Sequence, residues 1–182
     1  MSAPASLQYE DAFYWYLGRL TQAAAALDAV VSMAIQWLEK YNGREADASL
    51  FKPNVPFAHR LTKLSEITKE TFSHDQPEVS RDFSDWFERA NKARALRNNY
   101  VHARWGLRLP RDGAEPDVEY IPLQLGIDPT VTEATTWITF SEFNQYIEEF
   151  RRLHVELNKL YDRHSAAARP AAPPPTRRGK TP

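Results

Sequence analysis

An arginine and a histidine lie five positions apart in the stretch ALRNNYVHARWG, residues 95–106. Histidine titrates near neutrality and can accept or donate a proton, while the planar guanidinium of arginine holds a phosphate through paired hydrogen bonds. Arg97 and His102 are therefore candidates for general acid–base chemistry on a phosphodiester. Asn98 is four residues before His102 and shares its helical face, so it is a candidate to orient the imidazole or to bind the substrate.

Arg97 falls on the side of its predicted helix that otherwise carries apolar residues. At about 100° per residue, it lies within the arc formed by Phe83, Ala90, Ala93, Leu96 and Val101. Burying a guanidinium costs several kcal/mol unless an anion compensates it. Two kinds of anion remain open, namely a carboxylate of the first helix (Asp28 or Glu39) or a bound ligand.

The same spacing limits how Arg97 and His102 can act together. Five residues turn an ideal helix by about 140°, so the two side chains do not share a face. To bind one phosphate together, they need the helix to loosen near Tyr100, or a second copy of the chain to supply one of them. Gly106 favours a helix end nearby.

The surrounding segment is basic. Between Glu88 and Asp112 there is no carboxylate, and the cations are Arg89, Lys92, Arg94, Arg97, Arg104, Arg108 and Arg111. Arg94, Arg104 and Arg108 are candidates for RNA backbone contacts, and Tyr100 and Trp105 offer planes on which bases could stack. The alternative is a solvated helix face whose cations pair with carboxylates of neighbouring helices.

Apolar spacing predicts the elements that position these residues. Four helices are expected, over about 9–41, over about 56–72, from a cap at Asp75 or Ser80 through Val101, and from Ser141 to about His164. Asn42-Gly43 ends the first helix. Between the last two helices, GLRLP, VEYIPLQLG and TWITF predict short strands in a hairpin or three-stranded flap.

These elements predict one mainly α domain. We expect a four-helix up-and-down bundle over residues 9–164 with a β insertion at about 107–140, a flexible N-terminus at 1–8 and a disordered Pro-rich basic tail at 165–182. After Asp162 the tail has only basic charges, whereas the body is mildly acidic, which argues against a protein that coats nucleic acid without specificity.

Composition excludes several function classes. The chain has no cysteine, no histidine pair spaced as zinc ligands and no acidic cation loop, so no metal or other cofactor is expected. It also lacks a Gly-rich phosphate loop and a nucleophile elbow, which excludes P-loop, Rossmann and α/β-hydrolase enzymes. Without a signal-like N-terminus or a long apolar run, we expect a cytoplasmic protein that does not enter a membrane.

The motif Arg97-Asn98-Asn99-Tyr100-Val101-His102, on the third of four predicted helices, resembles the signature of the HEPN superfamily. That signature is an arginine followed after four to six residues by a histidine, often with a polar residue directly after the arginine. The resemblance implies a homodimer in which both motifs meet in one cleft. It also implies metal-independent cleavage of RNA to a 2′,3′-cyclic phosphate, the role of a toxin or defence effector, and restraint by an antitoxin or regulatory protein.

Two other interpretations remain. The same fold can serve as a non-catalytic module that binds nucleic acid, a nucleotide or a protein, with Arg97 and His102 holding an interface or an anion. The motif can also be a coincidence in an unrelated helical interaction protein. The aromatic residues Trp15, Trp37 and Trp86 are expected in the core or in a dimer interface, and His164 on an exposed face or at a helix end.

Overall fold

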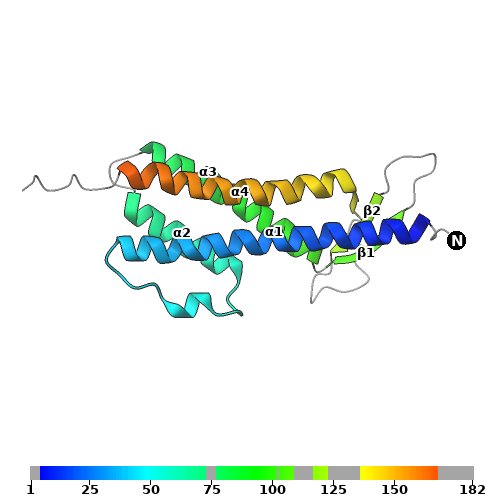
Figure 1. Cartoon of the computed structure of the whole chain (residues 1–182), viewed down its shortest axis with the longest axis horizontal. Helices are drawn as coiled ribbons and strands as arrows, with labels where there is room; N and C mark the ends of the chain where they lie inside the picture. The colour runs from blue at the N-terminus through cyan, green and yellow to red at the C-terminus, as the bar shows by residue number, and fades with distance from the viewer. Residues whose placement is uncertain (1–4, 73–76, 102, 109–116, 123–135, 168–182) are drawn as a thin grey trace, which may run out of the picture.

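The computed structural model describes residues 5–72, 77–101, 103–108, 117–122 and 136–167. These residues form a mainly α structure, as predicted, with a small sheet at one end (Figure 1). The elements are α1 (Ala5–Tyr41), the 3-10 helix η1 (Ala48–Phe51), α2 (Phe57–Phe72), α3 (Pro77–Val101), β1 (Ala103–Arg108), β2 (Asp117–Pro122), β3 (Thr136–Thr139) and α4 (Phe140–Ala167). Residues 168–182, most of the predicted tail, lie outside this description.

The helices do not follow the up-and-down order that we predicted. Asp28 in the middle of α1 pairs with Arg60 at the start of α2, and Asn42 just after α1 donates to Thr71 at the end of α2, with 2.9 Å between Nδ2 and Oγ1. Residue numbers therefore rise together along the two helices, so α1 and α2 run parallel (Figure 1).

The other two helices complete this arrangement. Stacked rings of Phe72 and Phe83 join the end of α2 to the start of α3, so α3 runs antiparallel to α2. Near its start α4 packs on Phe13 of α1 through Phe143, and near its end Tyr161 packs on Trp37. Helices α1, α2 and α4 thus point one way and α3 points the other (Figure 1).

The segment 42–56 explains the parallel pair. Its 15 residues can span about 50 Å when extended, whereas α2 is about 24 Å long. Gly43, with φ of 72°, closes α1 in a left-handed turn, and the backbone N–H of Arg44 donates to the carbonyl of Glu39 at 2.8 Å. The chain then returns along the bundle through η1 before α2 begins (Figure 1).

All four helices contribute to one apolar core. Trp86 is buried at its centre and donates its indole N–H to the carbonyl of Leu153 at 2.9 Å. Other large side chains that are almost completely buried include Leu20, Leu27, Ile35, Leu38, Leu61, Leu64, Ile67, Phe143, Ile147, Phe150 and Leu153. Each is worth about 1.5–3 kcal/mol of burial energy, so the three-four spacing of these residues fixes which face of each helix points inward.

The β insertion is an antiparallel sheet of order β1-β2-β3. Its first strand starts at Ala103, four residues before the predicted insertion. The α4 helix follows β3 directly and begins with a capping box, because the backbone N–H of Thr139 donates to Glu142 and that of Glu142 donates to the Thr139 hydroxyl oxygen. The cap is thus Thr139, and Ser141, which we expected to precede the helix, lies in its first turn.

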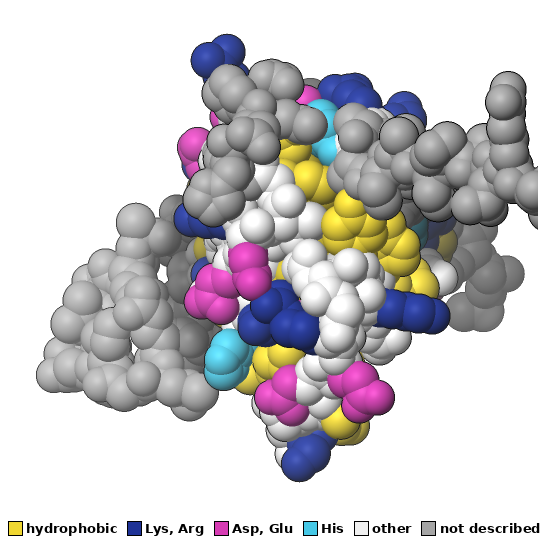
Figure 2. All heavy atoms as spheres, turned by 90° about the vertical axis from the view of Figure 1, so that its left-hand side faces the viewer, with side chains coloured by type: hydrophobic (Ala, Val, Ile, Leu, Met, Phe, Trp, Pro, Cys, Tyr) yellow, Lys and Arg dark blue, Asp and Glu magenta, His cyan; other side chains and the backbone are white. Residues whose placement is uncertain are grey.

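Two expectations about single residues are confirmed only in part. His164 lies in the last turn of α4, near a helix end as expected, but it is buried, with 6% of its surface exposed, and its ring packs on Phe83. Of the three tryptophans expected in the core or in a dimer interface, Trp86 is in the core, whereas Trp15 and Trp37 are 53% and 40% exposed on the single chain, so for these two the interface stays a prediction. Figure 2 faces the end of the bundle at which α1 ends, and there acidic and basic side chains are mixed over the described surface.

Candidate functional site

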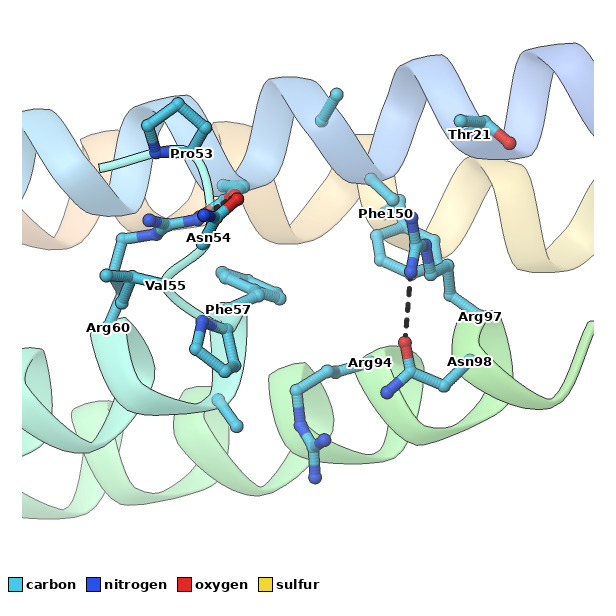
Figure 3. A pocket seen from close by; sticks show the side chains of 15 residues that line it. Thr21, Pro53, Asn54, Val55, Phe57, Arg60, Arg94, Arg97, Asn98 and Phe150 are labelled. Atoms are coloured by element: carbon cyan, nitrogen blue, oxygen red, sulfur yellow. Dashed lines mark hydrogen bonds and ion pairs between the residues drawn. The ribbon is translucent and has the colours of Figure 1, made fainter. Parts of the chain in front are cut away.

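A cleft of about 420 Å³ opens between α1, the segment before α2, and α3 (Figure 3). Three arginines, from α2 and α3, line it together with one acid, Asp28. We call it the arginine cleft; its lining residues are Thr21, Ala24, Ala25, Asp28, Pro53, Asn54, Val55, Pro56, Phe57, Ala58, Arg60, Arg94, Arg97, Asn98 and Phe150. The lining has an excess of positive charge, which favours an anionic ligand.

Arg60 is the structural arginine of this cleft. It is 8% exposed, and its Nε and Nη2 each lie 2.6 Å from an oxygen of Asp28, while Nη1 donates to the carbonyl of Leu50 at 3.0 Å. Such a two-pronged pair compensates the burial of both charges. Because it joins α1, the η1 segment and α2, this pair holds the returning chain in place.

The sequence left open whether Asp28 or Glu39 pairs with Arg97. Asp28 pairs with Arg60 instead. Glu39, the other carboxylate considered for Arg97, pairs instead with Arg44 at 2.5 Å and with Lys63 at 3.4 Å. Both carboxylates are therefore engaged by other cations. Among the described residues, no carboxylate forms an ion pair with Arg97.

Arg97 is half-buried, as its place within the apolar arc predicted. Figure 3 shows its guanidinium pointing from α3 toward α1, beside Phe150. Its Nη1 donates to Oδ1 of Asn98 at 3.1 Å. A guanidinium has five N–H donors, so most of its hydrogen-bonding capacity faces the cleft without a protein acceptor in the described part of the chain.

Arg94 precedes Arg97 by three residues and lies on the same side of α3. Its Nε is buried and has no hydrogen-bond partner. A buried donor without a partner costs about 1–3 kcal/mol. Figure 3 shows the Arg94 guanidinium pointing away from α1 and from that of Arg97, so Arg97 is the arginine whose unused donors face the cleft.

The basic window of the sequence separates into two groups. Arg89 pairs with Glu149 and Glu156 of α4 at 2.7 and 2.6 Å, and Lys92 pairs with Glu88 at 2.6 Å. These two cations fit the alternative interpretation, in which the cations of a solvated helix face pair with nearby carboxylates. Arg94 and Arg97 line the cleft instead.

Asn98 contacts Arg97. Its amide oxygen accepts the Arg97 hydrogen bond, which steers the guanidinium into the cleft. His102, the residue between the end of α3 and the start of β1, lies outside the described residues. So do the side chains of Arg104 and Arg108 on β1, which we predicted to contact RNA.

Tyr100 is in the interior and Trp105 is half-buried against the core, rather than both lying on a surface where bases could stack. Tyr100 is 2% exposed and packs on Phe143 of α4. The ring of Trp105 packs on Phe13 of α1, and its indole N–H donates to the carbonyl of Tyr100 at 3.1 Å. Aromatic side chains of α1 and α4 thus occupy the positions next to these two rings.

Sequence reasoning missed two parts of the site. Arg60 falls three residues after Phe57 and one before Leu61, inside the apolar arc of α2. An arginine at such a position indicates a buried guanidinium, as it did for Arg97. The second part is the segment Pro53–Phe57, which forms the wall opposite α3. No local pattern indicated it, because it reaches the cleft only through the return of the chain along the bundle.

The described residues do not offer a set of metal ligands. Within the described ranges, no three His, Cys, Asp or Glu side chains gather closely enough to hold an ion. A search of the same ranges found no helix with the length and apolar character of a membrane span.

Comparisons with known proteins give the chain no relative. It matches no protein-family model. Nor does it match a curated protein or a solved structure.

Proposed function

We propose that this chain is a metal-independent endoribonuclease of the HEPN type that acts as a homodimer and holds the scissile phosphate in the arginine cleft. The observation that carries the proposal is that Arg97 lines the cleft and has no carboxylate partner among the described residues. An RNA phosphodiester supplies acceptor oxygens for the unused donors of this guanidinium.

The chemistry follows from the residue types. Arg97 binds the non-bridging oxygens and stabilises the charge that develops on them during attack. His102 takes the proton of the 2′-hydroxyl, whose oxygen attacks the phosphorus, and a protonated imidazole returns a proton to the departing 5′-oxygen. The products are a 2′,3′-cyclic phosphate and a free 5′-hydroxyl, and no metal takes part.

The role of His102 rests on the resemblance of the motif to the HEPN signature. The parallel direction of α1 and α2 departs from the up-and-down bundle that we expected with it, so the six-residue motif alone carries the resemblance. A homodimer, a cytoplasmic role as a toxin or defence effector, and a restraining antitoxin or regulatory protein belong to the same proposal.

A cleavage assay in EDTA tests it. Single-stranded RNA is incubated with the full chain, and the products are analysed for 2′,3′-cyclic phosphate termini. Arg97→Gln and His102→Asn are each expected to abolish cleavage. Arg81→Gln is the matched control, because Arg81 is exposed on the same helix about 24 Å from Arg97 and loses the same charge. Absence of cleavage by the unaltered protein, at concentrations at which it is a dimer, would refute the nuclease.

Mixing the two inactive variants tests the shared site. A heterodimer contains one intact Arg97 on one chain and one intact His102 on the other. If the two residues act across the dimer, mixed subunits recover part of the activity. If they act within one chain, the mixture stays inactive.

A second candidate function uses the same cleft without cleavage. The bond from Arg97 to Asn98 favours it, because this asparagine then serves the phosphate-holding residue and not the imidazole. Such a module binds single-stranded RNA or a nucleotide. In this case Arg97→Gln weakens binding, His102→Asn does not, and no product forms.

A further inference from the structure

The arginine cleft has a second wall that phosphate binding does not use. Opposite α3, the residues Pro53, Val55, Pro56 and Phe57 present an apolar surface to the cleft. Figure 3 shows Phe57 on one side of the cleft and Arg97 with Phe150 on the other. A site built for an inorganic anion alone has no need of such a wall.

The size of the cleft also exceeds what one phosphate group needs. Its volume of about 420 Å³ is within the range of pockets that hold small organic ligands, roughly 300–1,000 Å³. Phe57 is half-buried and packs on the core, so its ring is held in position. A rigid aromatic ring beside open space is the feature on which unpaired bases stack.

Polar groups on both sides of the cleft point to a nucleobase rather than an aliphatic group. Asn54 and Asn98 both line the cleft, and each amide carries a donor as well as an acceptor. The Asn98 oxygen is engaged by Arg97, which leaves its N–H₂ group, whereas the exposed Asn54 offers both functions. Base edges present the same mixture of donors and acceptors.

We infer that the arginine cleft is a subsite for one unpaired nucleotide, with its base stacked on Phe57 and its phosphate held by Arg97. A base within a duplex is covered on both faces and cannot reach the ring, so the subsite selects single-stranded RNA. The inference rests on the proposed binding of an RNA phosphate by Arg97, and it adds Phe57 as the residue that recognises the base.

Two oligomers of equal charge separate base recognition from phosphate binding. One is a fluorescein-labelled single-stranded 12-mer with 2′-O-methyl riboses, which lacks the attacking hydroxyl and is not cleaved. The other is an abasic 12-mer with the same number of phosphates. The affinity of the full chain for each is measured by fluorescence anisotropy at one salt concentration.

Phe57→Leu is the test variant, because leucine keeps an apolar side chain at this partly buried position but removes the ring. Phe87→Leu is the matched control, since Phe87 is another half-buried phenylalanine on the core and lines a different cavity. Circular dichroism verifies that both variants fold.

The unaltered chain is expected to bind the base-containing oligomer about ten-fold more tightly than the abasic one. Phe57→Leu is expected to lose about ten-fold for the base-containing oligomer and nothing for the abasic one, and Phe87→Leu to change neither. Equal losses for both oligomers, or no loss for either, would overturn the base subsite.

The same two oligomers, measured also with Arg97→Gln, separate failure of this inference from failure of the proposed function. If the abasic oligomer binds in an Arg97-dependent manner and the bases add no affinity, the phosphate site stands and the base subsite falls. If neither oligomer binds, or if Arg97→Gln leaves both affinities unchanged, phosphate binding itself fails and the inference falls with it.

Discussion

Replacing Arg60 by methionine is expected to destabilise the folded chain strongly, whereas the same replacement of Arg97 is expected to leave its stability nearly unchanged. Both arginines lie in the same cleft and both are at least half-buried. They differ in their partners. Arg60 pairs through two bonds of 2.6 Å with Asp28, while Arg97 makes one bond of 3.1 Å to an amide.

The magnitudes follow from what each substitution leaves behind. Arg60→Met strands the Asp28 carboxylate and the Leu50 carbonyl, and breaking a buried ion pair in this way costs about 3–5 kcal/mol. Since the Asp28 side chain is 28% exposed, the lower end, about 3 kcal/mol, applies. Arg97→Met loses at most about 1 kcal/mol of hydrogen bonding and removes a partly desolvated charge beside Arg94.

Urea unfolding followed by circular dichroism measures the difference. With an m value of about 2–3 kcal/mol per molar urea, Arg60→Met lowers the midpoint by about 1 M or more, and Arg97→Met shifts it by less than about 0.5 M. If Arg97→Met destabilises the chain as much as Arg60→Met, Arg97 is part of the structural network. Its availability to a ligand would then be refuted.

Two further predictions concern the frame that holds the cleft. Burial raises the pKa of Tyr161, so its phenol stays neutral in the folded chain, whereas in the unfolded chain it ionises near pH 10. The free energy of unfolding therefore keeps its full contribution from this residue below about pH 10 and declines as the pH rises further. Tyr161→Phe should abolish most of this alkaline decline, measured as the urea midpoint between about pH 8 and pH 11, and should cost about 1 kcal/mol at neutral pH because the 3.2 Å bond with Thr68 is lost. A decline that persists unchanged in the variant would assign it to other groups. Thr139→Ala removes the capping box of α4 and should cost about 1 kcal/mol, seen as a fall of about 2–4 °C in Tm, whereas Glu142→Gln, which keeps an acceptor at that position, should cost less. Equal costs for the two variants would contradict the capping geometry.

Periodicity was enough to predict the helices and the inward position of Arg97. Buried positions such as Leu20, Leu27 and Ile35 recur every three or four residues, and burial of that face dominates local stability. The same helical position predicted a half-buried guanidinium at residue 97. What it could not predict was the partner, because Asp28 lies equally well on the inner side of α1 and is taken by Arg60.

Helix direction was not predictable from the same pattern. An apolar stripe is the same whether a helix points up or down, so the parallel α1–α2 pair depends on the non-local contacts of Arg60 and Asn42. The signal that was present is the length of segment 42–56, which exceeds the few residues that join antiparallel neighbours in a bundle.

Aromatic residues in the basic window were misjudged for a related reason. Tyr100 and Trp105 stand among arginines in the sequence, which is typical of base-stacking surfaces, yet both pack inward. Their packing partners, Phe13 and Phe143, are far away along the chain. The rings that do line the cleft, Phe57 and Phe150, both lie outside the basic window.

The salt dependence of RNA affinity tests the central claim most directly. Each phosphate contact that is lost should reduce the slope of log affinity against log salt by about 0.7 for a single strand. For the non-cleavable 12-mer, we predict a slope reduced by about that amount in Arg97→Gln and an unchanged slope in Arg81→Gln. Identical slopes for the unaltered chain and Arg97→Gln would show that this guanidinium holds no phosphate.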